Sequence, residues 1–150
     1  MSVERTLVLI KPDAIEKHMA GIALDRLERL DLELIAARMV KVTPELAAEH
    51  YRHLKTKPFF PALVDFMTGK LNPGSRGRLL ALVFEGENAL HLVRELAGAT
   101  DPVKAGPHTI RGSMGRNING TMENVVHASE TEADAQREIA LWLRPGDIAE

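Results

Sequence analysis

Two short runs of continuously apolar residues restrict most strongly the folds open to this sequence. They cover residues 6–10 and 79–84, and polar or turn-forming residues bound each run. Runs of this length and composition are typical of buried strands. Because segments with helical spacing separate them, the chain is expected to build a sheet whose strands alternate with helices.

A third segment, residues 32–42, alternates between apolar and charged residues and is predicted to be another strand. The residues expected on its buried face are Leu32, Leu34, Met39 and Val42. Met67 and Trp142 are expected in core positions of later helices. Further helices are predicted before and after this strand, several of them with proline at the first helical position.

Start signals for helices also occur in the second half of the chain. Asn88 is an expected N-cap, and Ser129 with Glu132 forms an S-x-x-E capping box ahead of the last helix. Residues 69–77 and 98–121 lack periodicity and contain glycine and proline, so both are expected to be loops. The first of these loops is expected to lie on the surface.

The resulting order is strand, helix, strand, helices, strand, helix, strand, helix. This βαββαβ-like pattern favours an α/β (α+β) sandwich, in which helices pack on one face of an antiparallel sheet. No repeat, linker or low-complexity tract divides the sequence. Residues 1–150 are therefore expected to form a single domain.

The composition excludes several kinds of protein. The 150 residues are 45% hydrophobic and 27% charged, which suits one soluble domain with a substantial core. A net charge of −2 gives no overall basic field for nucleic acid or an acidic membrane. Without cysteine there is no disulfide, thiolate metal site or cysteine nucleophile. With no signal-peptide pattern and no membrane-length apolar run, a cytoplasmic protein is expected.

His127 is the first candidate for chemistry. Two β-branched residues, Val125 and Val126, place it at the end of a predicted strand, close to the start of a helix. Free backbone N–H groups and the positive end of a helix dipole favour phosphate at such a junction. An imidazole can accept a phosphoryl group and pass it on. The plainer alternative is a histidine that merely ends a strand.

Other charged and polar residues occupy irregular positions, where functional residues concentrate. Together they would supply cations and a hydroxyl to the β- and γ-phosphates of a nucleotide. Taken singly, each also fits a solvated charge or a helix cap. They are Lys11, Arg94, Thr100 and Arg111.

At this point the sequence resembles the nucleoside diphosphate kinase family. The resemblance extends over about residues 4–143, and its signature blocks occur in the family's order. The blocks are Lys11-Pro12-Asp13, His50-Tyr51 with Pro58-Phe59-Phe60, Phe84-Glu85-Gly86, Gly98-Ala99-Thr100-Asp101-Pro102, Thr109-Ile110-Arg111-Gly112 and Asn124-x-x-His127-Ala128-Ser129.

The resemblance implies a ferredoxin-like fold and a ping-pong phosphotransfer through a phosphohistidine at His127. It implies that Glu138 hydrogen-bonds the ring nitrogen that does not attack, that Tyr51 lies beside the histidine, and that Phe59 stacks on the base. The remaining implied site residues bind phosphates or the ribose. These are Lys11, Arg94, Thr100, Arg111 and Asn124, with Lys11 and Asn124 near the ribose.

The same resemblance implies cofactors and partners. Mg²⁺ is expected to be bound mainly through the nucleotide phosphates, with no metal site formed by the protein itself. His50 and His53 are spaced i,i+3 but lack an evident third ligand. The expected partners are nucleoside di- and triphosphates and further copies of the chain, in a tetramer or hexamer. Neither a membrane nor nucleic acid is expected as a partner.

The sequence departs from the commoner family pattern at several places. Residues 70–77 lengthen one connection, and residues 112–123 lengthen the approach to the histidine. Aspartate is frequent in the family at the positions of Ser113 and Glu130, and an acidic residue is frequent at the position of His53.

The second departure leaves two asparagines as candidates for the ribose contact. Asn117 lies in a Gly-Arg-Asn-Ile sequence that resembles the usual lead into the histidine, whereas Asn124 lies three residues before His127. In a strand, three residues span roughly 10 Å, which one nucleotide can bridge from ribose to γ-phosphate. Asn124 is therefore the prediction, and Asn117 is expected to belong to loop structure.

Two rival functions remain open on the sequence alone. A ferredoxin-like module could bind nucleotides without turnover, because a fold does not prove an activity. However, such a module would not need both His127 and Glu138. A nucleic-acid-binding protein is a weaker alternative, because the sequence contains no basic stripe.

Overall fold

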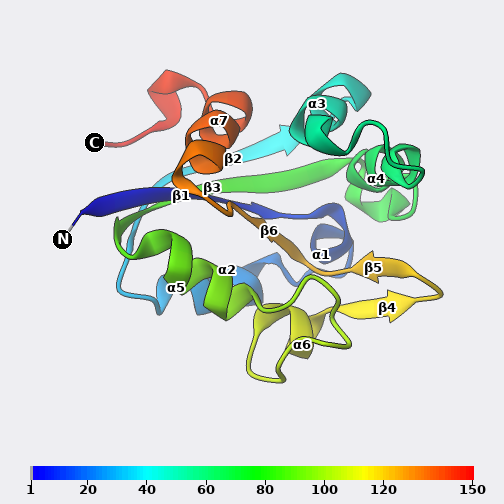
Figure 1. The fold of residues 1–150 in the computed structure, drawn as a ribbon, viewed down its shortest axis with the longest axis horizontal. Coiled ribbons are helices and arrows are strands. Elements are labelled where there is room, and N and C mark those ends of the chain that lie inside the picture. Colours follow the sequence, from blue (N-terminus) through cyan, green and yellow to red (C-terminus); the bar gives the residue numbers. More distant parts are fainter. Residues whose placement is uncertain (1) are drawn as a thin grey trace.

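A four-stranded antiparallel sheet organises the computed structural model, which describes residues 2–150 (Figure 1). Its strands are β1 (Val3–Ile10), β2 (Glu33–Lys41), β3 (Arg78–Glu87) and β6 (Val126–Ala128). Their spatial order is β2-β3-β1-β6, so the two long central strands are β3 and β1. Both apolar runs predicted as buried strands lie in these two, and the ferredoxin-like βαββαβ arrangement is confirmed.

Helices cover both faces of this sheet, so the prediction that they pack on one face was wrong. Helices α2 (Ala20–Glu28) and α5 (Ala89–Ala97) lie on one side, whereas α3 (Pro44–His50) and α7 (Glu132–Trp142) lie on the other (Figure 1). Strand β1 is apolar at every position from Leu7 to Ile10 because it contributes to two cores.

The alternation of side chains in β1 separates these two cores. Leu7 and Leu9 pack in the cluster that contains Trp142 of α7, and Val8 packs in the cluster that contains Val93 of α5. A continuous apolar run therefore indicates a sheet that is covered twice.

Short elements fill the remaining connections. The predicted loop over residues 98–121 contains a helix and the first strand of a hairpin, which forms a second, two-stranded sheet. The short elements are α1 (Pro12–Glu16), α4 (Phe60–Met67), α6 (Ile110–Met114), β4 (Arg116–Ile118), β5 (Thr121–Glu123) and 3-10 turns at Arg52–Leu54, Pro73–Ser75 and Pro145–Asp147.

One predicted helix cap is wrong, and a second has the predicted position without the side-chain hydrogen bond. Helix α7 is capped by Thr131, whose hydroxyl accepts a hydrogen bond from the Asp134 N–H at 3.1 Å, and not by Ser129. Asn88 occupies the N-cap position of α5 but makes no side-chain cap there. Instead Glu4 accepts from the Leu90 N–H at 3.0 Å, so a strand residue distant in sequence performs the capping.

The predicted inward face of β2 is also wrong. Leu34 is 38% exposed and Met39 is 52% exposed, whereas Ile35, Ala36 and Val40 are buried. A register shift between Leu34 and Ala36 in the pairing with β3 interrupts the simple alternation. The core positions predicted for Met67 and Trp142 are confirmed, because both side chains are fully buried.

The segment over residues 69–77 is not a free surface loop. Its Asn72 and Ser75 are buried, and the Glu16 carboxylate of α1 accepts hydrogen bonds from Asn72 Nδ2 at 2.9 Å and from the Gly74 N–H at 2.7 Å. The loop is thus attached to the helix that directly follows Lys11.

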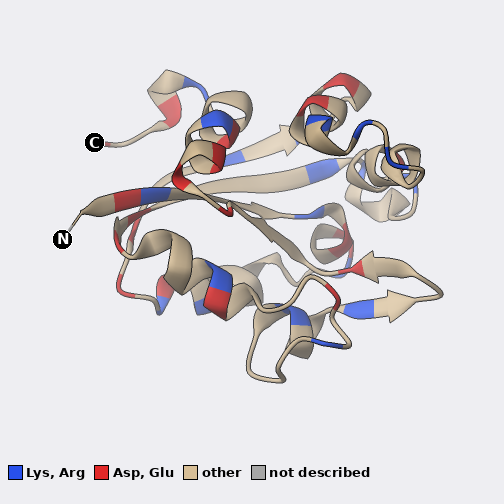
Figure 2. Ribbon diagram, viewed as in Figure 1, with Lys and Arg blue, Asp and Glu red and all other residues tan. Residues whose placement is uncertain are grey.

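Charges are interspersed over the fold. Figure 2 shows basic and acidic positions side by side on the helices and strand ends, without separation into a basic and an acidic face. Among residues 2–150, no helix combines the length and the apolar character needed to cross a membrane.

Candidate active site

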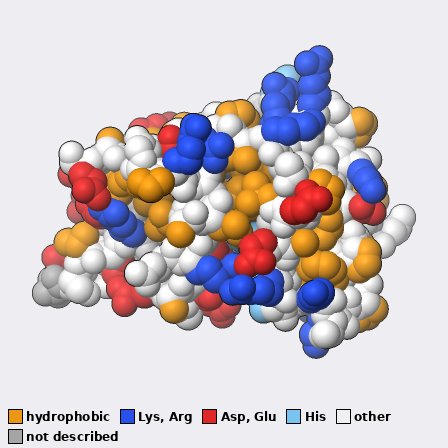
Figure 3. All heavy atoms as spheres, turned by 90° about the horizontal axis from the view of Figure 1, so that it is seen from above, with side chains coloured by type: hydrophobic (Ala, Val, Ile, Leu, Met, Phe, Trp, Pro, Cys, Tyr) orange, Lys and Arg blue, Asp and Glu red, His pale blue; other side chains and the backbone are white. Residues whose placement is uncertain are grey.

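A cleft of about 910 Å³ lies at the end of the sheet where β1 leads into α1 and the hairpin β4–β5 leads into β6. Helix α4 and the hairpin β4–β5 contribute to its walls. Figure 3 shows basic side chains at the margins of the face over α7, α3 and α4, with apolar and acidic side chains between them. All the site residues expected from the sequence line the cleft: Lys11, Tyr51, Phe59, Arg94, Thr100, Arg111, Asn124, His127 and Glu138.

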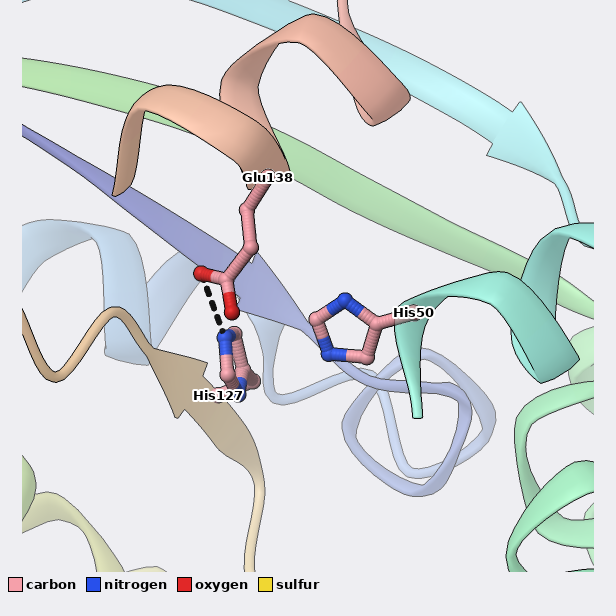
Figure 4. Close-up of side chains that lie close together, drawn as sticks. All are labelled: His50, His127 and Glu138. Atoms are coloured by element: carbon pink, nitrogen blue, oxygen red, sulfur yellow. Dashed lines mark hydrogen bonds and ion pairs between the residues drawn. The ribbon is translucent and has the colours of Figure 1, made fainter. Parts of the chain in front are cut away.

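His127 is held by the shortest strand of the main sheet. Strand β6 pairs with β1 so that His127 lies opposite Leu9, and its side chain is 21% exposed. Its Nε2 lies 3.0 Å from Oε1 of Glu138, which projects from α7 (Figure 4). Because Nε2 is occupied in this way, Nδ1 is the ring nitrogen left for chemistry.

Ser129 fixes the carboxylate behind the histidine. Its hydroxyl donates to Oε1 of Glu138 at 2.7 Å and accepts from the Leu7 N–H at 3.1 Å. Glu138, which is only 5% exposed, is therefore oriented by strand β1 through Ser129. The sequence analysis assigned Ser129 to a helix cap and missed this role, although its place in the His127-Ala128-Ser129 block was the available signal.

His50 is a second residue that the sequence analysis assigned no role in the site. Its ring lies against that of His127, with centroids 4.5 Å apart and planes at 84° (Figure 4). The Trp142 indole N–H donates to its Nδ1 at 3.0 Å, so the proton of the neutral ring is on Nε2. Burial is the main cause that lowers the pKa of His50 to about 2, so the ring stays neutral.

The same hydrogen bond argues against a metal ion between the two histidines. Ligand atoms of His50, His127 and Glu138 lie within 4.8 Å of one another, the only such cluster in the part of the chain that the structure describes. However, Nδ1 of His50 accepts from Trp142 and its Nε2 carries the proton, so neither nitrogen has a free lone pair. The cluster is a hydrogen-bonded array around His127.

Lys11 and Asn124 form a buried pair on the other side of the cleft. Lys11 Nζ donates to Asn124 Oδ1 at 2.7 Å and lies 4.9 Å from the ring centre of Phe66. Asn124 Nδ2 donates to the Thr100 carbonyl at 3.0 Å, which brings the three predicted residues together. Burial lowers the pKa of Lys11 to about 8, while the nearby Asp13 carboxylate opposes this shift.

Two arginines add positive charge to the cleft. Arg111 donates from Nη1 to the Gly98 carbonyl and from Nη2 to the Val126 carbonyl, both at 2.8 Å. Burial, and then the charge of Arg94, lower the pKa of Arg111 to about 10, which still leaves it charged at neutral pH. The guanidinium of Arg111 is thus held in place, and guanidinium groups are suited to bind a polyanion.

Tyr51 and Phe59 are aromatic residues of the cleft that differ in burial. The Tyr51 ring packs edge-on against His50, with centroids 4.7 Å apart, and burial raises its pKa to about 12. Its hydroxyl therefore keeps its proton and can donate a hydrogen bond. Phe59 directly precedes α4 and is 49% exposed, which leaves a flat aromatic surface available to a ligand.

The two asparagines occupy different structures, but Asn117 lies in a strand and not in the loop expected from the sequence. Asn117 lies in β4, where its Oδ1 accepts from the Gly120 N–H at 2.9 Å and so stabilises the hairpin turn. Asn124 lies in the cleft, but it is not in the strand of His127, because β6 begins at Val126. The expected extended path between Asn124 and His127 was therefore wrong.

Comparison with known proteins gives consistent results. The family model described as nucleoside diphosphate kinase matches residues 4–148. The nucleoside diphosphate kinase of Pyrococcus furiosus is 43% identical over 148 residues, covering 99% of this chain and 88% of the relative. That of Mycobacterium leprae is 46% identical over 144 residues, covering 95% and 98%.

Solved structures resemble the chain over nearly its whole length. The nucleoside-diphosphate kinase from Borrelia burgdorferi, a transition state mimic with bound vanadate and ADP, has a TM-score of 0.88 at 31% identity and covers 99% of this chain and 91% of its own. The halophilic enzyme from Halobacterium salinarum, in complex with CDP, has a TM-score of 0.88 at 37% identity, with coverage of 99% and 93%.

Proposed function

Since the chain belongs to the nucleoside diphosphate kinase family, we propose the tasks that its own cleft residues perform in that reaction. The protein is a phosphotransferase that moves the γ-phosphoryl group of a nucleoside triphosphate to a nucleoside diphosphate by way of a phosphohistidine. The observation that carries the assignment of His127 is its hydrogen bond to Glu138, which leaves only Nδ1 directed to the reaction.

In the first half-reaction, Nδ1 of His127 attacks the γ-phosphorus of the triphosphate. The bond from that phosphorus to the β-phosphate oxygen breaks, and the nucleoside diphosphate leaves. The ring becomes positively charged, and the Glu138 carboxylate stabilises that charge through Nε2–H. In the second half-reaction, a β-phosphate oxygen of another diphosphate attacks the phosphorus, and the P–N bond breaks.

The cations of the cleft act on the phosphates. Arg94, Arg111 and Lys11 neutralise the charge that develops on the transferred group, and the Thr100 hydroxyl donates a further hydrogen bond. Because Arg111 is already held by two backbone carbonyls, its guanidinium needs little reorganisation when the substrate binds.

The sugar and base bind farther out in the cleft. Asn124 and Lys11 form one preorganised pair that can hydrogen-bond ribose hydroxyls. The exposed ring of Phe59 stacks on the base, and stacking tolerates any base because every base has a π face. The Tyr51 hydroxyl donates a hydrogen bond to the substrate beside His127.

Mg²⁺ enters with the nucleotide as part of the substrate. The only three-residue ligand cluster within residues 2–150 contains His50, which has no lone pair to offer, so the phosphates are the ligands that the ion requires. When bound, Mg²⁺ supplies additional neutralisation of phosphate charge.

A homo-oligomer, either a tetramer or a hexamer, stays a prediction, as do a single domain over residues 1–150 and a cytoplasmic location. Two exposed apolar side chains, Leu34 and Met39, lie on β2, which is an edge strand of the sheet. A second copy of the chain would remove them from water, which supports self-association.

The proposal is tested by mixing the pure protein with ATP labelled in its γ-phosphate. An acid-labile, alkali-stable label on the protein that GDP removes as labelled GTP is the expected result. His127→Ala, with an unchanged circular dichroism spectrum, is expected to lose both the label and turnover. Labelling of that variant at the wild-type level would exclude His127 as the nucleophile.

A further inference from the structure

The backbone between Asn124 and His127 contains a conformation that its sequence disfavours. Val125 has φ of +73° and is 1% exposed. The Asn124 carbonyl accepts from the Val126 N–H at 2.7 Å, so Val125 is the central residue of a three-residue turn. A β-branched residue with positive φ is a genuine outlier, because its side chain clashes with the backbone in that region.

Asp13 lies directly against this turn. Its Oδ2 accepts from the Val125 N–H at 3.0 Å, and the Val125 carbonyl accepts from the Lys11 N–H at 2.8 Å. Both polar groups of the strained residue are therefore bound by residues 11–13, more than a hundred residues earlier in the chain.

The burial of Asp13 goes beyond what its place in a helix requires. An acid in the first turn of a helix commonly stays in water while it interacts with the helix dipole. Asp13 is instead 1% exposed, and its Oδ1 has no hydrogen-bond partner. Burial of the Asp13 carboxylate and the positive φ of Val125 are both unfavourable by themselves. Such costs are typical of functional sites, so the contact between the two residues is expected to support the site residues that flank Val125.

The turn fixes the relation between two site residues. On one side of it Asn124 meets Lys11, and on the other side His127 meets Glu138. If Val125 relaxed to an ordinary extended conformation, the chain direction before β6 would change, and these two contacts could not be kept together.

We propose that Asp13 is a positioning residue for phosphoryl transfer, which holds Val125 in its left-handed turn and thereby sets the placement of Asn124 relative to His127. This inference rests on the proposed function of the cleft. Asp13 touches no reacting atom, and it acts through the backbone of Val125.

Its charge gives Asp13 a second, separable effect on Lys11. The ionisable groups around Lys11 are Asp13 on α1, Arg111 on α6 and His50 on α3, with the uncharged Asn124 bound to Nζ. Of these, only Asp13 is an anion, so its loss lowers the pKa of Lys11. If the reaction needs Lys11 in its ammonium form, the fall of activity on the alkaline side of the pH profile would then begin at a lower pH.

The test begins with Asp13→Ala, for which kcat is expected to fall roughly 10- to 100-fold, the range for loss of a hydrogen bond to a charged group. Adding Val125→Gly to Asp13→Ala is expected to restore most of this loss, because glycine adopts positive φ without help. Val125→Ala in the same background is the matched control. It also shortens the side chain but keeps the penalty on positive φ, so it is expected to give no recovery.

Asp13→Asn separates geometry from charge, and it replaces Asp13→Ala should that variant fail to fold. The amide oxygen can still accept from the Val125 N–H, so kcat is expected to stay close to that of the wild type on the acidic side of neutrality, where Lys11 keeps its proton. The alkaline limb of the kcat/KM profile is expected to move to lower pH.

Two results would overturn the positioning role of Asp13. They are wild-type kcat in Asp13→Ala, and equal recovery with Val125→Gly and Val125→Ala. An unmoved alkaline limb in Asp13→Asn would overturn the separate effect of Asp13 on Lys11. None of them would affect the proposed function, which fails only if the wild-type protein forms no phosphohistidine that a nucleoside diphosphate discharges.

Discussion

The two ring nitrogens of His127 have different surroundings, and this difference orients the residue. Its two nitrogens differ only in their neighbours: Nε2 meets the Glu138 carboxylate, and Nδ1 is left for phosphorus. Ser129 fixes the carboxylate from one side, and the neutral His50 ring limits the movement of the imidazole. The nucleophile is thus oriented before substrate arrives, which reduces reorganisation during transfer.

Glu138→Gln tests the charge behind the histidine. The amide keeps the shape and an oxygen for Nε2–H, but it loses the charge that stabilises the imidazolium. Hydrogen bonds to charged groups are stronger by about 1–2 kcal/mol, so the phosphorylation rate in a single turnover is expected to fall roughly 5- to 30-fold. An effect restricted to KM would show that Glu138 does not act on the reacting ring.

Arg94→Ala tests the proposed phosphate contact whose side chain makes the fewest bonds within the protein. Arg111 also binds two backbone carbonyls, whereas Arg94 lines the cleft without such bonds among the contacts of the described residues. Loss of about 1.5–3 kcal/mol is expected to lower kcat/KM roughly 10- to 150-fold. Arg29→Ala, on the exposed surface of α2, is the control and should match the wild type. Equal kinetics of the two variants would remove Arg94 from the site.

At the scale of elements, the hairpin β4–β5 and the segment after it decide which asparagine lines the cleft. Asn117 stabilises the hairpin turn, and Asn124 follows β5 into the cleft. The sequence predicted Asn124 for the cleft from a strand-like spacing to His127, and the turn at Val125 replaces that strand. Its contact with the ribose stays a prediction.

The asparagines make a matched pair for measurement. Asn124→Ala is expected to lower kcat/KM more than Asn117→Ala does. It should also reduce the preference for normal nucleotides over those that lack a 3′-hydroxyl, because the lost contact is to the ribose. If Asn117→Ala alone reduced that preference, the assignment of the ribose contact would be wrong.

The connection over residues 69–77 was predicted to be a surface loop, but it is bound to α1. Glu16 binds it through two hydrogen bonds, one of them from a backbone N–H. Glu16→Ala is therefore expected to lower the free energy of unfolding by about 1–2 kcal/mol, allowing for its partial exposure. Urea denaturation measures this, with Glu28→Ala on the outer surface of α2 as the control. Equal midpoints for the two variants would show that the loop is as free as its composition suggested.

The parts of the fold that sequence could predict are those set by local patterns. The strands containing residues 6–10 and 79–84, and the proline at the start of α1, follow from apolar runs and turn chemistry. The caps of α5 and α7, the inward face of β2 and the left-handed Val125 depend on distant partners such as Glu4 and Asp13. No periodicity within a segment records such partners.

Similar reasoning explains what was predictable in the site. The expected cleft residues were found through motifs that resemble a known family, and all of them line one cleft. The network behind them was not predicted, because Ser129 and His50 had acceptable structural roles in sequence. Their importance depends on hydrogen bonds to Glu138 and from Trp142, which form only when α7 packs on the sheet.

At the scale of the whole molecule, the site lies where both layers of helices meet the same strands. Strand β1 ends one residue before Lys11, β6 contains His127, and α7 contains Glu138. Helix α7 lies above the sheet in Figure 1. Helix α6 contributes Arg111 from the other side. Helices on both faces of the sheet therefore bury two hydrophobic cores. They also bring residues into the cleft from both sides of the sheet.

The central claim is that phosphate is carried by Nδ1 of His127 while Nε2 remains bonded to Glu138. Nuclear magnetic resonance of protein containing ¹⁵N-labelled histidine, phosphorylated by ATP in the probe, measures this directly. The expected spectrum shows coupling of ³¹P to Nδ1 and a proton on Nε2. Coupling of ³¹P to Nε2 would mean that the Glu138 hydrogen bond breaks during the reaction, and it would contradict the account.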